Sequence, residues 1–326
     1  MVKIGNVQSE MLRVKSGVPQ GSILGPLLFL LYINDITFSC NQLNIDLYAD
    51  DSTMFASGFK LSEIQVILQT DLDSVAKWCI LNNMSLHPKK SKCMTIGTRQ
   101  RLQNINQLTL KVNETFLENV TAQKVLGVFI DNTLNWRSHI DYVCKKLNSK
   151  IQLLKRVLYF LTDDMKSLFY NSYKLPVFDY CCTIWGKDNK SYINKINNLQ
   201  QRAAKIILNK PTRFPTAGLY KQLNWLSFSD RCKYYSAVLV YKTKNDMAPS
   251  YICELLIFSK NKHYSLRSIM HNDLVLNRKP RTNLFKDTFA HYSMNVWNNI
   301  PTFIKTSSSL KSFKYQYKCF LIDSSD

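Results

Sequence analysis

The most constraining feature of this 326-residue sequence is a pair of adjacent aspartates, Asp50 and Asp51, between two short apolar runs in the stretch NIDLYADDSTMFASG. Residues 45–56 predict a β-hairpin that is apolar on both arms, with the two carboxylates at or near its tip. Two unit charges a few ångströms apart repel by roughly 1 kcal/mol in water, and by more at partly buried sites. A fold tolerates that repulsion when divalent cations lie beside the carboxylates. For a pair that stands alone, a solvated Asp-Asp turn is the simpler interpretation.

The charge balance points to a polyanionic partner. The chain has 43 Lys and Arg against 23 Asp and Glu, a formal net charge of +20. Nucleic acid is the simplest such partner, because each phosphate contact releases counterions. We expect the basic excess to be spread along nearly the whole chain rather than confined to a tail, which favours nucleic acid over a merely soluble basic protein. The length and the 45% of apolar residues allow two or three domains with real cores and exclude a disordered chain.

The cysteines and the apolar runs limit the compartment and the partners. The nine cysteines are scattered, without C-x-x-C or zinc-finger spacing, so we expect reduced thiols in the cytoplasm or nucleus. The N-terminus has no apolar region of a signal peptide, which predicts that the chain is not secreted. The longest apolar run, residues 23–33, is shorter than the about 20 residues that span a bilayer, so we expect no membrane partner.

Local patterns predict a mixed α/β piece followed by a helical half. The expected elements are a hairpin over 2–15 with Gly5-Asn6 as its turn, a helix after the SGVPQGS turn that Ser22 caps, a helix from Leu61 to about Asn83, strands over 91–97, 108–112 and 124–131, and mostly helical chain over 137–210. Trp185, Trp225 and Trp297 are expected as core anchors rather than as platforms on which bases stack.

Further blocks accompany the aspartate pair in a fixed order: SGVPQGSILGPLLF at 16–29, HPKKSK at 87–92 and KVLGVFID at 124–131. Together with YADD, this order resembles reverse transcriptases of LINE-type (non-LTR) retrotransposons, particularly the Jockey-like group. Three later blocks resemble the C-terminal region of that group: FDYCCTIWG at 178–186, LQQRAAKIIL at 199–208 and VWNNIP at 296–301. Any single tetrapeptide has little specificity, but ordered blocks over essentially the whole chain are specific.

The resemblance implies an α+β fold that contains part of a right-handed polymerase. It implies a partial palm over residues 1–132 without the fingers and the first palm strand, a helical thumb over 133–215, and a basic, aromatic C-terminal region over 216–326. The implied activity is RNA-directed DNA polymerisation by two-metal nucleotidyl transfer. Its cofactor would be Mg²⁺, and its partners an RNA template, a DNA primer and dNTP.

The roles of individual residues are also implied by the resemblance. Asp50 and Asp51 match the metal-binding catalytic pair, and Lys90 matches a lysine that assists the departure of pyrophosphate. The nucleotide and template pocket is matched by Pro19, Gln20 and Gly21, and the hairpin that grips the primer by Leu126 and Gly127. Residues that match contacts to the nucleic-acid backbone are Lys145, Lys146, Lys150, Lys155, Arg156, Arg202 and Lys205. For each of these basic residues, as for Lys89 and Lys92 beside Lys90, a solvated surface position is the alternative.

One expected carboxylate is missing. The family takes another aspartate from a strand upstream of the SG-x-PQG block, whereas none of the 15 residues before Ser16 is an aspartate. We therefore expect a C-terminal fragment of a longer protein, which is inactive alone and has an unpaired strand edge and an exposed apolar face. A non-catalytic module that binds RNA or RNA–DNA duplex is the alternative. A group II intron maturase can share YADD, but the absent Cys/His-rich nuclease segment and the C-terminal blocks favour the retrotransposon group.

Overall fold

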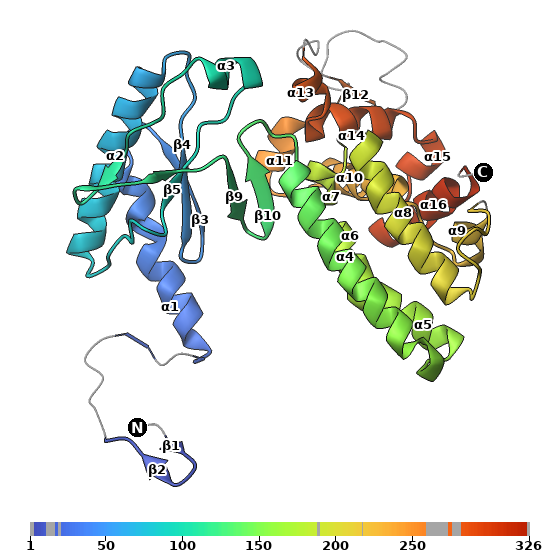
Figure 1. Cartoon of the computed structure of the whole chain (residues 1–326). Coiled ribbons are helices and arrows are strands. Elements are labelled where there is room, and N and C mark those ends of the chain that lie inside the picture. The colour runs from blue at the N-terminus through green and yellow to red at the C-terminus, as the bar shows by residue number, and fades with distance from the viewer. Residues whose placement is uncertain are drawn as a thin grey trace. The chain divides into compact units, whose positions relative to one another are not determined.

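The computed structural model describes residues 3–10, 17–18, 21–187, 190–216, 218–258, 273–275 and 282–324. The chain divides into two compact units, Met1–Gln123 and Lys124–Asp326 (Figure 1). The first unit is mixed helix and strand, and the second is mainly helical. Each unit has its own buried clusters of apolar side chains.

The two units differ in charge, which corrects one expectation from the sequence. Residues 1–123 contain 11 Lys and Arg and 10 Asp and Glu, a formal charge of +1. Residues 124–326 contain 32 Lys and Arg and 13 Asp and Glu, a formal charge of +19. The prediction that the basic excess is spread along nearly the whole chain is therefore wrong. Attraction for a polyanion resides almost entirely in the second unit.

The first unit begins with a small hairpin and a short helix. Its elements are β1 (Lys3–Ile4), β2 (Val7–Gln8), α1 (Leu24–Ile33), a 3₁₀ helix (Asn34–Ser39), β3 (Asn44–Tyr48), β4 (Asp51–Phe55), α2 (Leu61–Leu81), β5 (Lys92–Cys93), α3 (Arg99–Gln103), β6 (Lys111–Val112), β7 (Thr115–Phe116), β8 (Glu118–Asn119) and β9 (Ala122–Val125). The predicted turn at Gly5-Asn6 is confirmed, with Gly5 at φ +59°. The predicted cap is also present, because Gly25 N donates to Ser22 Oγ at 3.0 Å.

The strands of the first unit pair only two at a time. Strand β3 pairs antiparallel with β4, β5 pairs parallel with β8, and β6 pairs antiparallel with β7. The strands expected over 91–97 and 108–112 are shorter than predicted, at two residues each. Among the described residues no sheet exceeds two strands, so both outer edges of the β3–β4 pair lack a partner strand there.

Helix α1 leaves much of its apolar surface uncovered. Five of its leucines have exposed fractions between 47% and 68%: Leu24, Leu27, Leu28, Leu30 and Leu31. Only Gly25 and Ile33 of this helix are buried. This surface belongs to a helix, so the exposed apolar face predicted for the strand beside the missing one stays a prediction. Within the described ranges, no helix combines the length and the apolar content that crossing a bilayer requires.

The second unit is a helical assembly, and β9 continues into it from the first unit across the boundary after Gln123. After β10 (Val128–Asp131) come α4 (Arg137–Val157), a 3₁₀ turn (Leu158–Phe160), α5 (Asp163–Phe169), a π-helical turn (Tyr170–Lys174), α6 (Leu175–Asp179), α7 (Cys182–Trp185), α8 (Lys190–Ile207), α9 (Leu219–Gln222), α10 (Phe228–Lys244), α11 (Ser250–Leu255), β11 (Ile257–Phe258), β12 (Leu274–Val275), α13 (Asn283–Lys286), α14 (Phe289–Asn298), α15 (Thr302–Lys305) and α16 (Leu310–Asp323). The single strand predicted over 124–131 is instead the β9–β10 hairpin.

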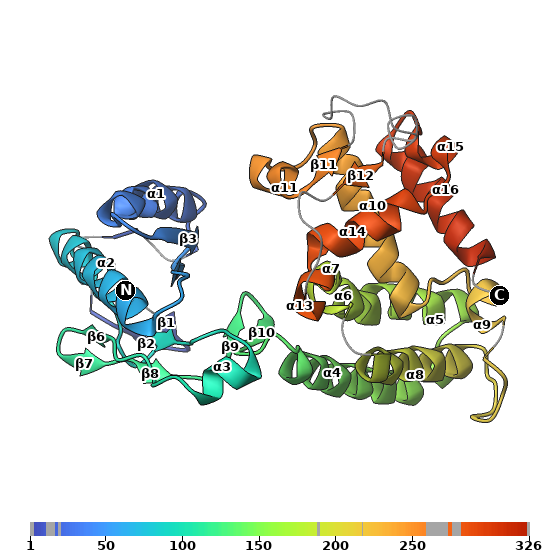
Figure 2. The same cartoon turned by 90° about the horizontal axis from the view of Figure 1, so that it is seen from above.

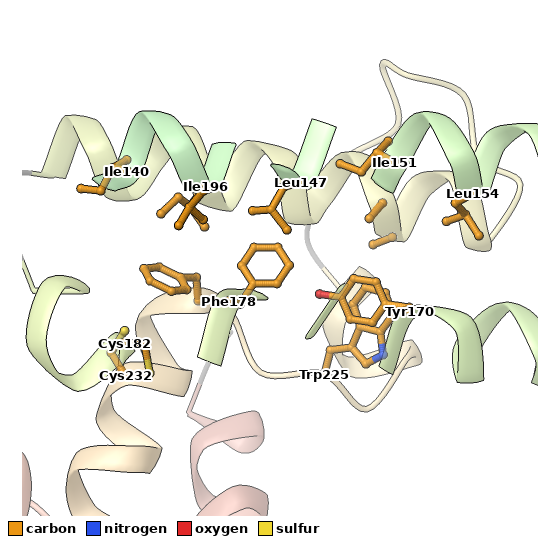
Figure 3. Close-up of a cluster of buried hydrophobic side chains, with 14 of the residues drawn as sticks. Ile140, Leu147, Ile151, Leu154, Tyr170, Phe178, Cys182, Ile196, Trp225 and Cys232 are labelled. Atoms are coloured by element: carbon orange, nitrogen blue, oxygen red, sulfur yellow. The ribbon is translucent and has the colours of Figure 1, made fainter. Parts of the chain in front are cut away.

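Two apolar cores stabilise the second unit. In the first, one face of α4 packs on α8, which lies beside it, and on the stacked rings of Tyr170 and Trp225, whose centroids are 3.7 Å apart (Figures 2 and 3). The second core lies between α10, α14 and α16 around Trp297 and Phe313. Trp185 and Trp297 are fully buried and Trp225 is 8% exposed, so the prediction of tryptophan core anchors is confirmed.

Candidate functional site

The aspartate pair occupies the tip of a hairpin, as the sequence predicts. Tyr48 pairs with Asp51, which leaves Ala49 and Asp50 as a two-residue loop between β3 and β4. Ala49 adopts φ +53°, a left-handed conformation that costs a residue with a side chain about 1 kcal/mol. Strain of this kind is often found where a functional group must be presented in one orientation. The role of the pair in metal binding stays a prediction.

Both carboxylates are available to a ligand. Asp50 and Asp51 are exposed, and no hydrogen bond or ion pair to either side chain occurs within the described residues. The pairing register places Asp51 on the outer face of the hairpin together with Asp46, while Leu47 faces the core. Carboxylate oxygens are the donors that Mg²⁺ prefers, so the pair fits this ion. No group of three or more His, Cys, Asp or Glu side chains suited to a metal exists in the part of the chain that the structure describes.

A buried aspartate that the sequence analysis missed fixes the base of this hairpin. Asp71 of α2 is fully buried and accepts backbone N–H groups from Asn41, Gln42 and Leu43 at 3.2, 2.9 and 2.8 Å. Charge-assisted hydrogen bonds of this kind are stronger than neutral ones. Asp71 thus anchors the segment that enters β3. Its position on the core-facing side of α2, one turn before Val75, was the signal that could have identified it.

The other candidates of the first unit are only partly placed. Pro19 and Gln20 lie outside the described residues, whereas Gly21 adopts φ +85°, which favours glycine. Lys90 is exposed in a turn, where its N–H donates to His87 O at 3.0 Å. No contact joins Lys90 to the aspartate pair among the described residues. Its neighbour Lys92 instead forms an ion pair with Glu118 across the β5–β8 pair.

A tyrosine from another part of the second unit contacts the turn of the β9–β10 hairpin. Leu126 and Gly127 adopt φ +45° and +86°, which turns the chain back on itself. Tyr180 Oη donates to Leu126 O at 2.5 Å. A Cβ atom on Gly127 would come within 3.3 Å of the Tyr180 ring, so the absence of a side chain permits this approach. Tyr180 lies in the FDYCCTIWG block, and its role was not predicted.

A buried histidine holds the second strand of the same hairpin. Phe129 N donates to His139 Nδ1 at 3.3 Å, and His139 is 2% exposed. Burial lowers the pKa of His139 to about 4. The imidazole is therefore neutral at pH 7, and its Nδ1 can accept the hydrogen bond. Together, Tyr180 and His139 give the Leu126–Gly127 turn a fixed position within the second unit.

The predicted backbone-contact residues fall into two groups. Five are exposed on the helices of the second unit: Lys145, Lys146, Lys155, Arg156 and Arg202. Lys150 is half-buried, donates to Tyr173 O and lies 3.7 Å from the centroid of the Tyr173 ring. Lys205 donates to Thr212 O at 2.8 Å. The last two lysines have structural partners, so the exposed five are the stronger candidates for nucleic-acid contact.

Comparisons with known proteins show similarity to reverse transcriptases. The family model described as reverse transcriptase (RNA-dependent DNA polymerase) matches residues 1–130. The chain is 28% identical over 236 residues to a probable RNA-directed DNA polymerase from transposon BS of Drosophila melanogaster, covering 69% of this chain and 26% of that protein. It is 22% identical over 311 residues to the RNA-directed DNA polymerase from mobile element jockey of the same species, covering 92% of this chain and 32% of the relative. The jockey polymerase of Drosophila funebris is 24% identical over 265 residues, 78% of this chain and 28% of its own length.

Residues 1–130 therefore match a reverse transcriptase domain. The resemblance to reverse transcriptases of non-LTR retrotransposons of the Jockey-like group, predicted from the order of the motifs, is confirmed by these relatives. It spans about a quarter to a third of the length of these relatives. No solved structure matches it.

Proposed function

We propose that this chain supplies the metal-binding hairpin and a nucleic-acid-binding unit of an RNA-directed DNA polymerase. The observation that carries the proposal is a pair of exposed carboxylates at a hairpin tip, without partners among the described residues, within the region that matches the reverse transcriptase family model. The proposed substrates are an RNA template, a DNA primer and dNTP. The proposed division is a palm over 1–132, a thumb over 133–215 and a C-terminal region over 216–326.

In the proposed reaction, the primer 3′-hydroxyl attacks the α-phosphorus of dNTP. A new phosphorus–oxygen bond forms, and the bond to the leaving pyrophosphate breaks. Asp50 and Asp51 would hold Mg²⁺, which when bound activates the attacking hydroxyl and stabilises the charge on the leaving group. Lys90 would neutralise pyrophosphate, while Pro19, Gln20 and Gly21 would shape the pocket for template and nucleotide. The Leu126–Gly127 turn would hold the primer end.

A polypeptide of only these 326 residues should polymerise poorly. The described hairpin offers two carboxylates, and no third acid joins them among the described residues. A third carboxylate from another strand would complete the coordination of two Mg²⁺ ions, so its absence should lower the rate by orders of magnitude. Incubation with a primed RNA template, dNTPs and Mg²⁺ tests this expectation, and robust extension would contradict it.

The second candidate function is a non-catalytic module that binds RNA or RNA–DNA duplex. The formal charge of +19 in residues 124–326 favours it, because the binding charge lies apart from the unit that carries the aspartates. Titrating duplex binding against salt for the wild type and for Asp50→Ala/Asp51→Ala separates the two functions. Unchanged affinity without extension by either protein supports the binding module, whereas extension that only the wild type performs supports the polymerase.

A further inference from the structure

Two lysines converge on one tyrosine beside the β9–β10 hairpin. Lys124 Nζ lies 5.2 Å from the ring centroid of Tyr142, and Lys146 Nζ lies 4.8 Å from it. Lys124 belongs to β9, whereas Tyr142 and Lys146 lie one turn apart on α4. The hairpin and the helix therefore contribute one ammonium group each to the same tyrosine, in a cluster that we call the Tyr142 cluster.

No carboxylate among the described residues forms an ion pair with the lysines of this cluster. Within the described residues, neither Lys124 nor Lys146 has a carboxylate partner, and the nearby carboxylate of Asp141 pairs with Lys195 at 3.5 Å. A hydrogen bond with Lys146, together with the charges of both lysines, lowers the pKa of Tyr142. The two contacts with the ring leave both ammonium groups with their full positive charge. An anion bound beside the tyrosine would neutralise part of that charge.

The cluster is also held rigidly next to the Leu126–Gly127 turn. The Phe129 and Tyr142 rings form an edge-to-face pair with centroids 5.2 Å apart, which joins the hairpin to α4. The hydrogen bond from Phe129 N to His139 joins them a second time. Because these contacts fix the hairpin against α4, anion binding has to order only the side chains and not the backbone that carries them.

We propose that Lys124, Tyr142 and Lys146 bind one backbone phosphate of the nucleic-acid strand that runs past the Leu126–Gly127 turn. The proposal rests on the proposed function and extends it to Lys124 and Tyr142, to which the resemblance assigns no role. Both ammonium groups and the phenolic hydroxyl donate, so they match the acceptor oxygens of one phosphate.

The test is binding of the full chain to a fluorescent RNA–DNA duplex with a recessed primer end, measured over a range of salt concentrations. The variants are Lys124→Gln/Lys146→Gln, which removes both charges, and Tyr142→Phe, which removes only the hydroxyl. Each lysine that neutralises a phosphate contributes about one to the slope of log affinity against log salt. Because the two lysines share one phosphate, the double variant should lose about one unit of that slope, and Tyr142→Phe should bind roughly tenfold more weakly with an unchanged slope.

Matched controls lie on α16, where Lys311 and Tyr315 are exposed and one turn apart. Lys311→Gln and Tyr315→Phe should keep the affinity and the slope of the wild type. A wild type that binds the duplex while the double variant keeps its full slope would overturn the phosphate site and leave the proposed function standing. A wild type that shows no salt-dependent binding would overturn both. Thermal unfolding of every variant confirms that the fold is retained.

Discussion

Helices α1 and α4 show how differently the two units are built. The leucines of α1 are about half exposed, whereas α4 has a complete buried face in which Leu147 and Leu154 are fully inaccessible to solvent. The first unit combines this uncovered apolar surface with two-stranded sheets and almost no net charge. The second unit combines two closed cores with nearly all of the positive charge.

The difference predicts that the first unit is the less stable of the two. Exposed apolar surface such as that of α1 often marks a contact with another segment or protein. A short helix gains most of its stability from tertiary packing, so α1 and the hairpin that carries the aspartates should be the weakly stabilised part of the chain. The second unit should fold cooperatively with its own residues.

The largest contrast should come from removing a leucine side chain in each helix. Leu147→Ala opens a cavity in the core of the second unit and should lower its free energy of unfolding by about 2–5 kcal/mol. Leu31→Ala, at a position that is 68% exposed, should change stability by no more than about 0.5 kcal/mol. Urea unfolding followed by circular dichroism measures both. Equal losses of unfolding free energy from the two variants would show that α1 is packed in solution, which would contradict the proposed difference between the units.

The next effect concerns the anchor of the aspartate hairpin. Asp71→Ala removes the acceptor of three backbone N–H groups in a buried site and should destabilise the first unit by about 3 kcal/mol. Because that unit is expected to be only marginally stable, hydrogen exchange in residues 41–55 should become fast while the core of α4 stays protected. Asp73→Ala, two residues further on an exposed side of α2, is the matched control and should leave exchange unchanged.

The second unit should lose stability at mildly acidic pH because of His139. Burial lowers the pKa of His139 in the folded state to about 4, below its usual 6.5. Between these values the unfolded chain binds the proton and the folded chain does not, so stability is fully present above pH 6.5 and falls as the pH drops toward 4. The expected loss between pH 7 and pH 5 is about 2 kcal/mol.

Urea unfolding of the wild type and of His139→Gln at the two pH values isolates this contribution. The glutamine can accept the hydrogen bond from Phe129 N and does not titrate, so its stability should vary less with pH. His87→Gln, at an exposed position, should keep the pH dependence of the wild type. A wild type and a His139→Gln variant with the same pH dependence would contradict the assignment of a neutral, buried imidazole.

The smallest effect should come from removing the hydrogen bond between Tyr180 and the Leu126–Gly127 turn. Tyr180→Phe removes the hydrogen bond to Leu126 O and should cost about 1 kcal/mol. Exchange of the amides in residues 126–129 should rise, while the distant α10–α16 core should be unaffected. Tyr159→Phe, on a side chain that is 92% exposed, is the control. Unchanged exchange at the turn would show that Gly127 and its neighbours hold the hairpin without Tyr180.

The sequence predicted those parts of the fold that depend on neighbouring residues. The Gly5-Asn6 turn, the Ser22 cap, helix α2 and the hairpin that carries Asp50 and Asp51 are all local patterns, and all are confirmed. The parallel pairing of β5 with β8 joins residues about 26 positions apart, and no local pattern encodes it.

Local sequence patterns likewise do not reveal the long-range contacts of the candidate site. Asp71 and Tyr180 act on backbone groups that are distant in the sequence, at separations of about 30 and 54 residues. Periodicity and motifs do not reveal such contacts. The charge asymmetry was present in the sequence, but it became visible only when the boundary between the units was known.

The central claim is that Asp50 and Asp51 form a divalent-metal site. Its most direct measurement is electron paramagnetic resonance of Mn²⁺, a stand-in for Mg²⁺, titrated into the full chain, with Asp46→Asn as the control for a neighbouring carboxylate on the same hairpin face. The wild type should bind Mn²⁺, and excess Mg²⁺ should displace it. Asp46→Asn should retain this binding, whereas Asp50→Asn/Asp51→Asn should abolish it. Binding that survives the loss of both aspartates, or that Asp46→Asn removes equally, would contradict the central claim.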